Sequence, residues 1–534
     1  MNMSAVLNSL PTRILGAVCD TWRRPNPLWI RELRQASRIK RTPLILMAVT
    51  ILAAIAMGAV SGMSSDYDAP AEIGATLFQV FFSMAFFLVA LIGPAMGANC
   101  IASEREGKTW EPLILTGFPA RAMARGKFLA ALTSVLQYLA ILAPVGALPF
   151  LFGGVSAFEV VIAFLCLTVF SCLGVGFGLA VGSSLTNGRA AIVVAIVCAA
   201  VLAVGGYLIL GVELGREAHR IWGNVPRSAV WFPNALANVP VSTPFIVLLV
   251  VQPVVGALVS GWLFYEVTAA NMTSAFKDQC SGLLRWFTVM TPLLAAALAA
   301  PLVVEAPPWL DRSAWRALAI MVGFLLFAAV LFQGTPVRPS KPGPGLIQTM
   351  TRLMLGGLLC FALLTTSTLA IVADRAAACH IDRFVRFVGC TGWYFGGFVV
   401  FVIGLAAWLR TRVATVGAAR VWLCVVLLLT ISGPFVIAAV SGVLSDDKQS
   451  SLAFAAPSPG YTLLLSTELS KPAFHDAIAN TVLCGLVWAL LGLGFFGSAM
   501  LRSRAAIRAH EAMAPDPASC ATATATKADE ASAA

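Results

Sequence analysis

Stretches of about 20 or more mainly apolar residues recur along nearly the whole chain and limit its folding more than any other feature. A helix of about 20 apolar residues crosses a bilayer, where every backbone group must be hydrogen-bonded within the protein. Of the 534 residues, 59% are hydrophobic and 11% charged, whereas soluble domains contain about 25% charged residues. The expected spans lie near residues 43–62, 76–100, 128–152, 159–183, 190–212, 244–268, 287–304, 315–333, 353–372, 387–408, 421–443 and 477–500. The sequence therefore predicts an all-α polytopic membrane protein with about 12 transmembrane helices.

The basic residues predict how these helices are oriented. With a cytoplasmic N-terminus, every inner segment carries Lys or Arg, and the first, "RELRQASRIKRTP", has five basic residues against Glu32. Lys and Arg are enriched in cytoplasmic loops, and the first loop usually dominates orientation. The outer segments are more acidic or mixed, except "DRAAACHIDRFVR". We therefore expect both termini in the cytoplasm of a multi-pass cell-membrane protein; the Ala- and Gly-rich composition suits a bacterial inner membrane.

The order of spans suggests two halves of six helices each. The apolar runs that start at Arg189 and Arg420 are similar, and each precedes a segment with Pro and aromatic residues. Because spanning helices share Leu, Val and Ala, this likeness could also be compositional. The expected division is a cytoplasmic N-terminus with an amphipathic helix at 1–42, a first half at 43–270 with a cytosolic loop at 101–127, a cytoplasmic linker at 271–286, a second half at 287–508 and a disordered tail at 509–534. The second-half loop at 334–352 has no acidic residue, so it is a degenerate counterpart of 101–127.

The loop "CIASEREGKTWEPLILTGFPARAMARGKF", residues 100–128, places eight charged side chains between two apolar spans. A charge at the centre of a span costs about 2.5–3.5 kcal/mol, so we expect this segment in water on the cytoplasmic side. Gly107 can end the preceding helix, and Thr109 can cap a short amphipathic helix, "WEPLILT". A rival interpretation makes Ser103 and Glu106 a capping box that starts this helix earlier. Both predict a short cytosolic helix between two spans.

The residues before the first span predict another short helix. In "NPLWIRELRQASRIKR", Asn26 can cap a helix and Pro27 suits its first position. Trp29 lies roughly opposite a stripe of arginines spaced at i, i+3, i+7 and i+10. This pattern is typical of a helix lying on the inner leaflet; the alternative is a positive flank that only sets orientation. The stripe consists of Arg31, Arg34, Arg38 and Arg41.

Together, these features resemble the permease subunits of ABC-2 type transporters, with the resemblance strongest over residues 25–270. The usual family pattern is close to ERExGTLExLLxTPLSrxxixxGK, which residues 104–127 match, with Gly107 one position early. The resemblance implies an ATP-driven exporter in which a coupling helix near 109–116 docks on a separate ATPase subunit. The segment 216–240 would be a re-entrant or lid-like element over the exit. The implied coupling residues are Glu104, Arg105, Glu106, Gly107, Thr109, Trp110, Glu111, Leu113 and Leu115, and the implied connecting helix contains Trp29, Arg31, Arg34 and Arg38.

No GxxxxGK[ST] sequence occurs, so this chain is not expected to be an enzyme that hydrolyses ATP; ATP and Mg²⁺ would be bound by the partner. The four His residues stand apart, and we expect no catalytic residue, metal site or cofactor in this chain. The expected partners are an ABC ATPase subunit, membrane lipids and, if one chain does not supply both halves, a second permease chain. The net charge of +11 reflects loop residues that orient the helices, so nucleic acid is not expected.

Other functions are compatible with the composition. A polytopic enzyme acting on lipid-linked substrates would need convergent polar residues in an outer loop, and "DRAAACHIDRFVR" is the best such cluster. A secondary transporter would need ionisable residues inside its spans. Glu266, near the inner end of the sixth span, is the candidate, although an interfacial position suits it better. A membrane scaffold is a further alternative. Co-purification of an ATPase distinguishes the permease from these functions.

Overall fold

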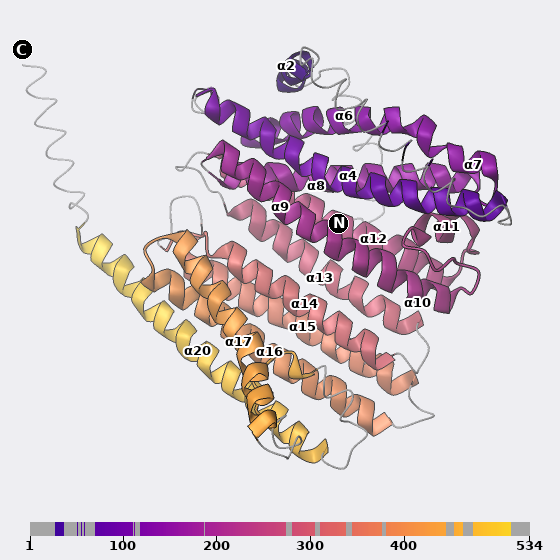
Figure 1. Ribbon diagram of the computed structural model, residues 1–534. Coiled ribbons are helices and arrows are strands. Elements are labelled where there is room, and N and C mark those ends of the chain that lie inside the picture. Colours follow the sequence, from indigo (N-terminus) through magenta and orange to yellow (C-terminus); the bar gives the residue numbers. More distant parts are fainter. Residues whose placement is uncertain are drawn as a thin grey trace, which may run out of the picture. The chain divides into compact units, whose positions relative to one another are not determined.

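Every regular element that the computed structural model describes is a helix (Figure 1). The structure describes residues 27–36, 51, 55, 58, 70–109, 112, 118–185, 187–273, 280–304, 310–337, 344–375, 381–444, 453–462 and 474–513. In chain order the helices are α2 (Pro27–Ala36), α4 (Pro70–Glu106), α6 (Ala120–Gly146), α7 (Leu148–Phe152), α8 (Ala157–Ser184), α9 (Gly188–Gly206), η1 (Tyr207–Glu213), α10 (Leu214–Ile221), α11 (Trp231–Asn238), η2 (Phe245–Val251), α12 (Gln252–Met272), α13 (Ser281–Val304), α14 (Leu310–Phe332), α15 (Leu346–Arg375), α16 (Ile381–Arg412), α17 (Val416–Leu444) and α20 (Phe474–Met513). The elements η1 and η2 are π-helices that continue into α10 and α12.

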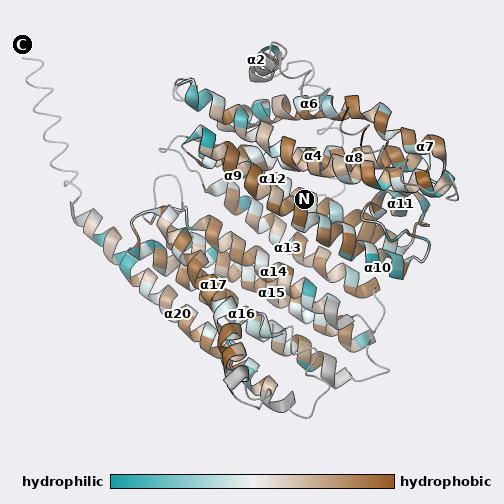
Figure 2. Ribbon diagram, in the orientation of Figure 1, coloured by the Kyte–Doolittle hydropathy of each residue, from teal (hydrophilic) through white to brown (hydrophobic). Residues whose placement is uncertain are grey.

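Eleven helical stretches between Pro70 and Ala509 are long and apolar enough to cross a membrane. Figure 2 shows hydrophobic residues along most of their length and hydrophilic residues mainly near their ends. These stretches cover eleven of the expected spans, so the all-α multi-pass class is confirmed for the described residues. The first expected span, 43–62, lies outside them except at positions 51, 55 and 58. The number of 12 spans therefore stays a prediction.

Several helices extend past their predicted boundaries. α13 starts at Ser281, inside the expected linker, because Leu283 and Trp286 are buried side chains that continue its packed face. α15 starts at Leu346, inside the loop expected at 334–352. α20 continues to Met513, past the expected start of the tail at 509, because its last turns are rich in the strong helix formers Ala and Arg.

The chain divides into two compact units, Met1–Trp286 and Phe287–Ala534, with the boundary inside α13. In the first unit, α4 packs against α6, α8 and α9. A Cβ atom added at Gly97 of α4 would lie 2.4 Å from the carbonyl oxygen of Val175, and one at Gly178 of α8 would lie 2.1 Å from that of Pro94. Small residues allow this close approach of spanning helices. The glycines of α4 and α8 thus explain why these two helices approach each other closely.

In the second unit, α16 is the central helix and packs against α14, α15, α17 and α20. In the apolar stretch of α16, 83% of the residues are buried, so other helices cover most of its apolar surface and little of it is left to contact lipid. Added Cβ atoms at Gly397 and Gly404 would each lie 2.1 Å from a carbonyl oxygen of α20, at Gly485 and Gly492 respectively. Lipid provides no hydrophobic force between helices, so this close packing is what stabilises the pair.

Candidate functional site

The charged segment that the sequence singled out begins with the last turn of α4. α4 ends at Glu106, and Lys108 follows with a φ of +54°, in the left-handed region. The amide of Thr109 donates to Glu104 O at 2.9 Å, and the amide of Lys108 donates to Arg105 O at 3.2 Å. This pair of hydrogen bonds is a Schellman motif, which satisfies carbonyl groups that would otherwise be unpaired at the helix end.

The helix end differs from the prediction by one residue. Lys108, rather than Gly107, adopts the left-handed conformation that glycine tolerates best. The ABC-2 pattern has its glycine one position later than Gly107, at the position that Lys108 occupies here. The rival capping box of Ser103 and Glu106 is wrong, because both residues lie inside α4, where Ser103 O accepts a bond from the Gly107 amide at 3.0 Å.

Glu104 is the centre of a group of three charges, which we call the Glu104 cluster (Arg31, Glu104 and Lys127). The Glu104 side chain is 7% exposed, and its Oε1 lies 3.0 Å from Nζ of Lys127, which is fully buried. Nζ of Lys127 also donates to Cys100 O at 3.0 Å. Arg31 donates from α2 to the same carboxylate oxygen of Glu104. One carboxylate therefore joins α2, α4 and α6.

The cluster corrects the expectation that the whole 101–127 segment lies in water. Glu104 and Lys127 are inside the protein, where an isolated charge costs several kcal/mol and a well-bonded counter-charge offsets that cost. Arg31 is 44% exposed, so its contact with Glu104 contributes less, about 0–1 kcal/mol. The contact between Lys127 and Glu104 is thus the buried part of the cluster.

α2 starts at Pro27, as the sequence predicts, and packs against α6. Nε1 of Trp29 donates to Oγ1 of Thr133 on α6 at 3.3 Å, so this ring contacts protein at its polar edge. Arg31 and Arg34 are both exposed on α2. The helix is therefore fixed to α6 by Trp29 and to α4 by Arg31.

A second ion pair, between an exposed arginine and a buried carboxylate, lies at the start of α6. Nη2 of Arg121 is 3.1 Å from Oε1 and 3.2 Å from Oε2 of Glu266 on α12. Nε1 of Trp262 donates to the same carboxylate at 3.1 Å. A Cβ atom at Gly282 would lie 2.2 Å from Oε2 of Glu266, so a larger residue at this position would displace the carboxylate. Glu266 is buried by protein and paired with Arg121, and its expected position at the membrane interface stays a prediction.

Both ends of the loop between α4 and α6 are therefore anchored. On the α4 side, Nη2 of Arg105 donates to Ser183 O at the end of α8 at 3.0 Å. On the α6 side, Arg121 is paired with α12 and Lys127 with α4. Charge-assisted hydrogen bonds of this kind are about twice as strong as neutral ones. The two ends of this loop therefore contact α2, α8 and α12 through charged side chains.

Glu106 differs from Glu104 in its surroundings. Its side chain is 52% exposed and lies 3.5 Å from the guanidinium of Arg189, which is itself 89% exposed. An exposed pair of this kind contributes about 0–1 kcal/mol. Glu106 is thus available to a binding partner, whereas Glu104 is part of the protein interior.

The opposite end of the first unit contains a buried carboxylate as well. Glu159 forms a capping box with Ser156 at the start of α8. It also accepts from Nδ2 of Asn238 at 3.0 Å and from Nδ2 of Asn234 at 3.3 Å. Both asparagines belong to α11, within the segment 216–240 expected as a re-entrant or lid-like element. Glu159 therefore fixes α11 on the end of α8.

The sequence and the structure overlap only partly at these sites. The sequence predicted a functional role for Glu104, but it did not predict the side chains that Lys127, Arg121 and Glu159 contact. The only feature of the sequence that pointed to Lys127 was the Gly-Lys pair at the end of the ABC-2 pattern. The predicted site residues and segments that lie outside the described residues include Trp110, Glu111, Leu113, Leu115, Arg38, Arg41, the N-terminal residues 1–26 and the tail residues 514–534.

Comparisons with protein-family models, with curated proteins and with solved structures find no match to this chain.

Proposed function

We propose that this chain is the membrane-spanning permease subunit of an ATP-driven exporter of the ABC-2 type, with ATP hydrolysis on a separate subunit. The observation that carries the proposal is the 104–127 segment, where a match to the ABC-2 pattern coincides with the Glu104 cluster. A coupling element needs a firm connection to the spanning helices, because a loose loop would absorb movement instead of transmitting it. The anchored ends of this loop meet that need.

In this proposal, the partner ATPase docks on the loop between α4 and α6 and moves it when nucleotide binds. Arg31 and Lys127 hold α2 and α6 to Glu104, so the three helices move together. The Arg121–Glu266 pair passes the movement to α12. At the opposite end, Glu159 holds α11 on α8, and release of this contact would open the exit path.

The residues have distinct roles in this mechanism. Glu106 and Lys108 are exposed and face the partner, together with the coupling residues expected at 110–115. Glu104, Lys127 and Arg121 position the loop. ATP and Mg²⁺ are bound by the partner, and the membrane is a bacterial inner membrane with the loop on its cytoplasmic side.

Co-purification tests the proposal. The tagged chain is extracted in a mild detergent from its native membrane, and retained chains with a GxxxxGK[ST] sequence are identified by mass spectrometry. We expect such a chain with the wild type, and at least about threefold less of it with Glu106→Ala, because charges at the rim of an interface set association. Replacement of residues 110–117 by Gly and Ser should abolish retention.

Glu213→Ala is the matched control. Glu213 is also exposed and also paired with an exposed arginine, Arg216, at 2.8 Å, but it lies at the opposite end of the first unit. Retention should not change in this variant. Full retention of the ATPase after replacement of 110–117 would reject the proposal.

A further inference from the structure

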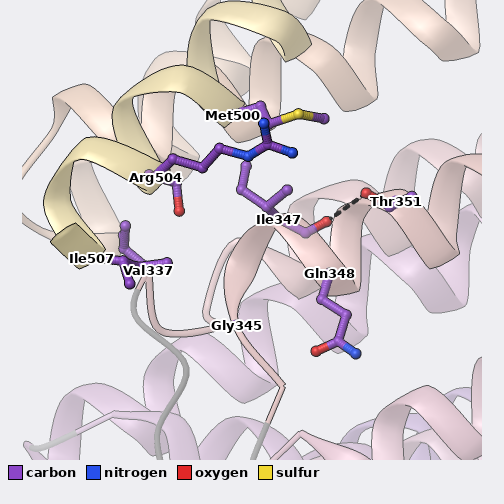
Figure 3. A pocket seen from close by; sticks show the side chains of 9 residues that line it. Val337, Gly345, Ile347, Gln348, Thr351, Met500, Arg504 and Ile507 are labelled. Atoms are coloured by element: carbon purple, nitrogen blue, oxygen red, sulfur yellow. Dashed lines mark hydrogen bonds between the residues drawn. The ribbon is translucent and has the colours of Figure 1, made fainter. Parts of the chain in front are cut away.

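A pocket of about 360 Å³ lies in the second unit, between the last turns of α20 and the first turns of α15 (Figure 3). Its volume is within the range of small-ligand sites, about 300–1,000 Å³. Met500, Ile507 and Ile347 supply apolar lining, and Arg504, Ser503 and Gln348 supply polar lining. Figure 3 shows Arg504 extending from α20 toward Ile347 of α15. The pocket is thus amphipathic, with a cation on one wall.

The charges near this pocket on α15 and α20 are mainly basic, with Glu511, one turn after Ile507 in the sequence, as the acidic exception. Arg504 has no hydrogen-bond or ion-pair partner among the described residues, although it lines the pocket. Arg352, Arg502 and Arg508 lie within about two turns of it along α15 or α20, and all three are exposed. Segments 344–361 and 497–509 contain no Asp or Glu. The pocket therefore favours an anion.

The position of the pocket along α20 corresponds to the edge of the membrane. Residues 477–501 contain no charged side chain, and these 25 residues span about 37 Å as a helix, against a hydrocarbon core of about 30 Å. The pocket lies where this apolar run changes to the basic sequence "RSRAAIR". An amphipathic, basic pocket at this depth matches the chemistry of a phospholipid headgroup.

Apolar surface continues from the pocket along α20. Leu493 lies seven residues before Met500, on the same helical stripe, and is 51% exposed. A Cβ atom added at Gly497 would meet nothing within 4 Å, so there is open space beside the helix. This space can take an acyl chain.

From these observations we propose that the pocket between α15 and α20 binds one anionic phospholipid, with its phosphate at Arg504 and an acyl chain along α20. A lipid held there joins the two helices at the membrane edge. The site uses only residues of the second unit and needs no ATPase. A negative result in the lipid-binding test would therefore leave the proposed function untouched, and the reverse also holds.

The test measures binding of dioctanoyl phosphatidylglycerol to the purified full-length chain in a neutral detergent. A lost charge-assisted hydrogen bond weakens binding about tenfold. Arg504→Gln and the pocket-filling Ile507→Trp should each weaken binding at least about fivefold. Arg502→Gln removes the same charge from α20 outside the pocket, and should weaken it less than twofold. The unfolding temperature of each variant, measured in parallel, should match the wild type.

Three results would overturn the proposal. Equal effects of Arg504→Gln and Arg502→Gln would indicate diffuse attraction to basic residues instead of a site. Equally tight binding of dioctanoyl phosphatidylcholine would show that the site does not select an anionic headgroup. Equally tight binding of glycerol 3-phosphate would show that the pocket takes a soluble anion without acyl chains.

Discussion

The Glu104–Lys127 pair predicts a specific pattern of stabilities. Glu104→Gln removes the carboxylate that lies 3.0 Å from the fully buried ammonium of Lys127. Removal of one partner of a buried ion pair costs about 3–5 kcal/mol. Lys127→Met keeps the length of the side chain, and Glu104 retains Arg31, so its cost should be lower, about 1–3 kcal/mol.

The double variant Glu104→Gln/Lys127→Met is the decisive one. It removes both charges, and replacement of a whole buried pair is often close to neutral. We therefore expect it to be more stable than Glu104→Gln alone, by about 2 kcal/mol. Arg31→Gln should cost no more than about 1 kcal/mol, since Arg31 is 44% exposed.

Thermal unfolding of the purified chain in one detergent, followed by tryptophan fluorescence, measures this order. For domains of 150–250 residues, 1 kcal/mol corresponds to about 2–4 °C. Glu104→Gln should thus lower the midpoint by roughly 6 °C or more, and the added Lys127→Met should restore several degrees. Additive losses, with the double variant the least stable of the set, would refute the account of the cluster.

Three further predictions concern the first unit. Lys108→Gly should raise the stability by about 0.5–1 kcal/mol, because it removes the strain of a positive φ at the end of α4; an unchanged midpoint would contradict this. Gly178→Ala should lower the stability by about 1–3 kcal/mol, because its Cβ would lie 2.1 Å from Pro94 O, while Gly205→Ala, a helical position with nothing within 4 Å, should not lower it. Glu159→Leu should release α11, measured as faster maleimide labelling of a cysteine placed in that helix, and labelling at the wild-type rate would argue against its holding role.

The class of the fold could be predicted from the sequence because the length of an apolar run fixes whether a helix can cross a membrane. The ends of the helices were harder to predict from the sequence. The start of α13 at Ser281 depends on burial of Leu283 and Trp286, and α20 continues past 509 on the helix propensity of Ala and Arg. Composition does not reveal which side chains another helix will cover.

The candidate site shows the same limit. The pattern at 104–127 identified Glu104 as a candidate residue. From the sequence alone, however, all charged side chains of this segment were expected to be exposed to water. Arg121 and Glu266 are 145 positions apart, and Arg31 and Glu104 are 73 apart. Such pairings arise from tertiary packing, which one sequence does not encode locally. For the same reason, the contrast between buried Glu104 and exposed Glu106 required the structure.

The most direct test of the central claim is photo-cross-linking from the loop that joins α4 and α6. Lys108 is exposed, so a photoreactive lysine analogue can replace it without disturbing the cluster, and a second photoreactive residue at the exposed Arg216 reports on the opposite end. On irradiation of intact cells, we predict a covalent product between position 108 and a chain that contains GxxxxGK[ST], with none from position 216. A product with such a chain from 216 alone, or none from 108, would contradict the account.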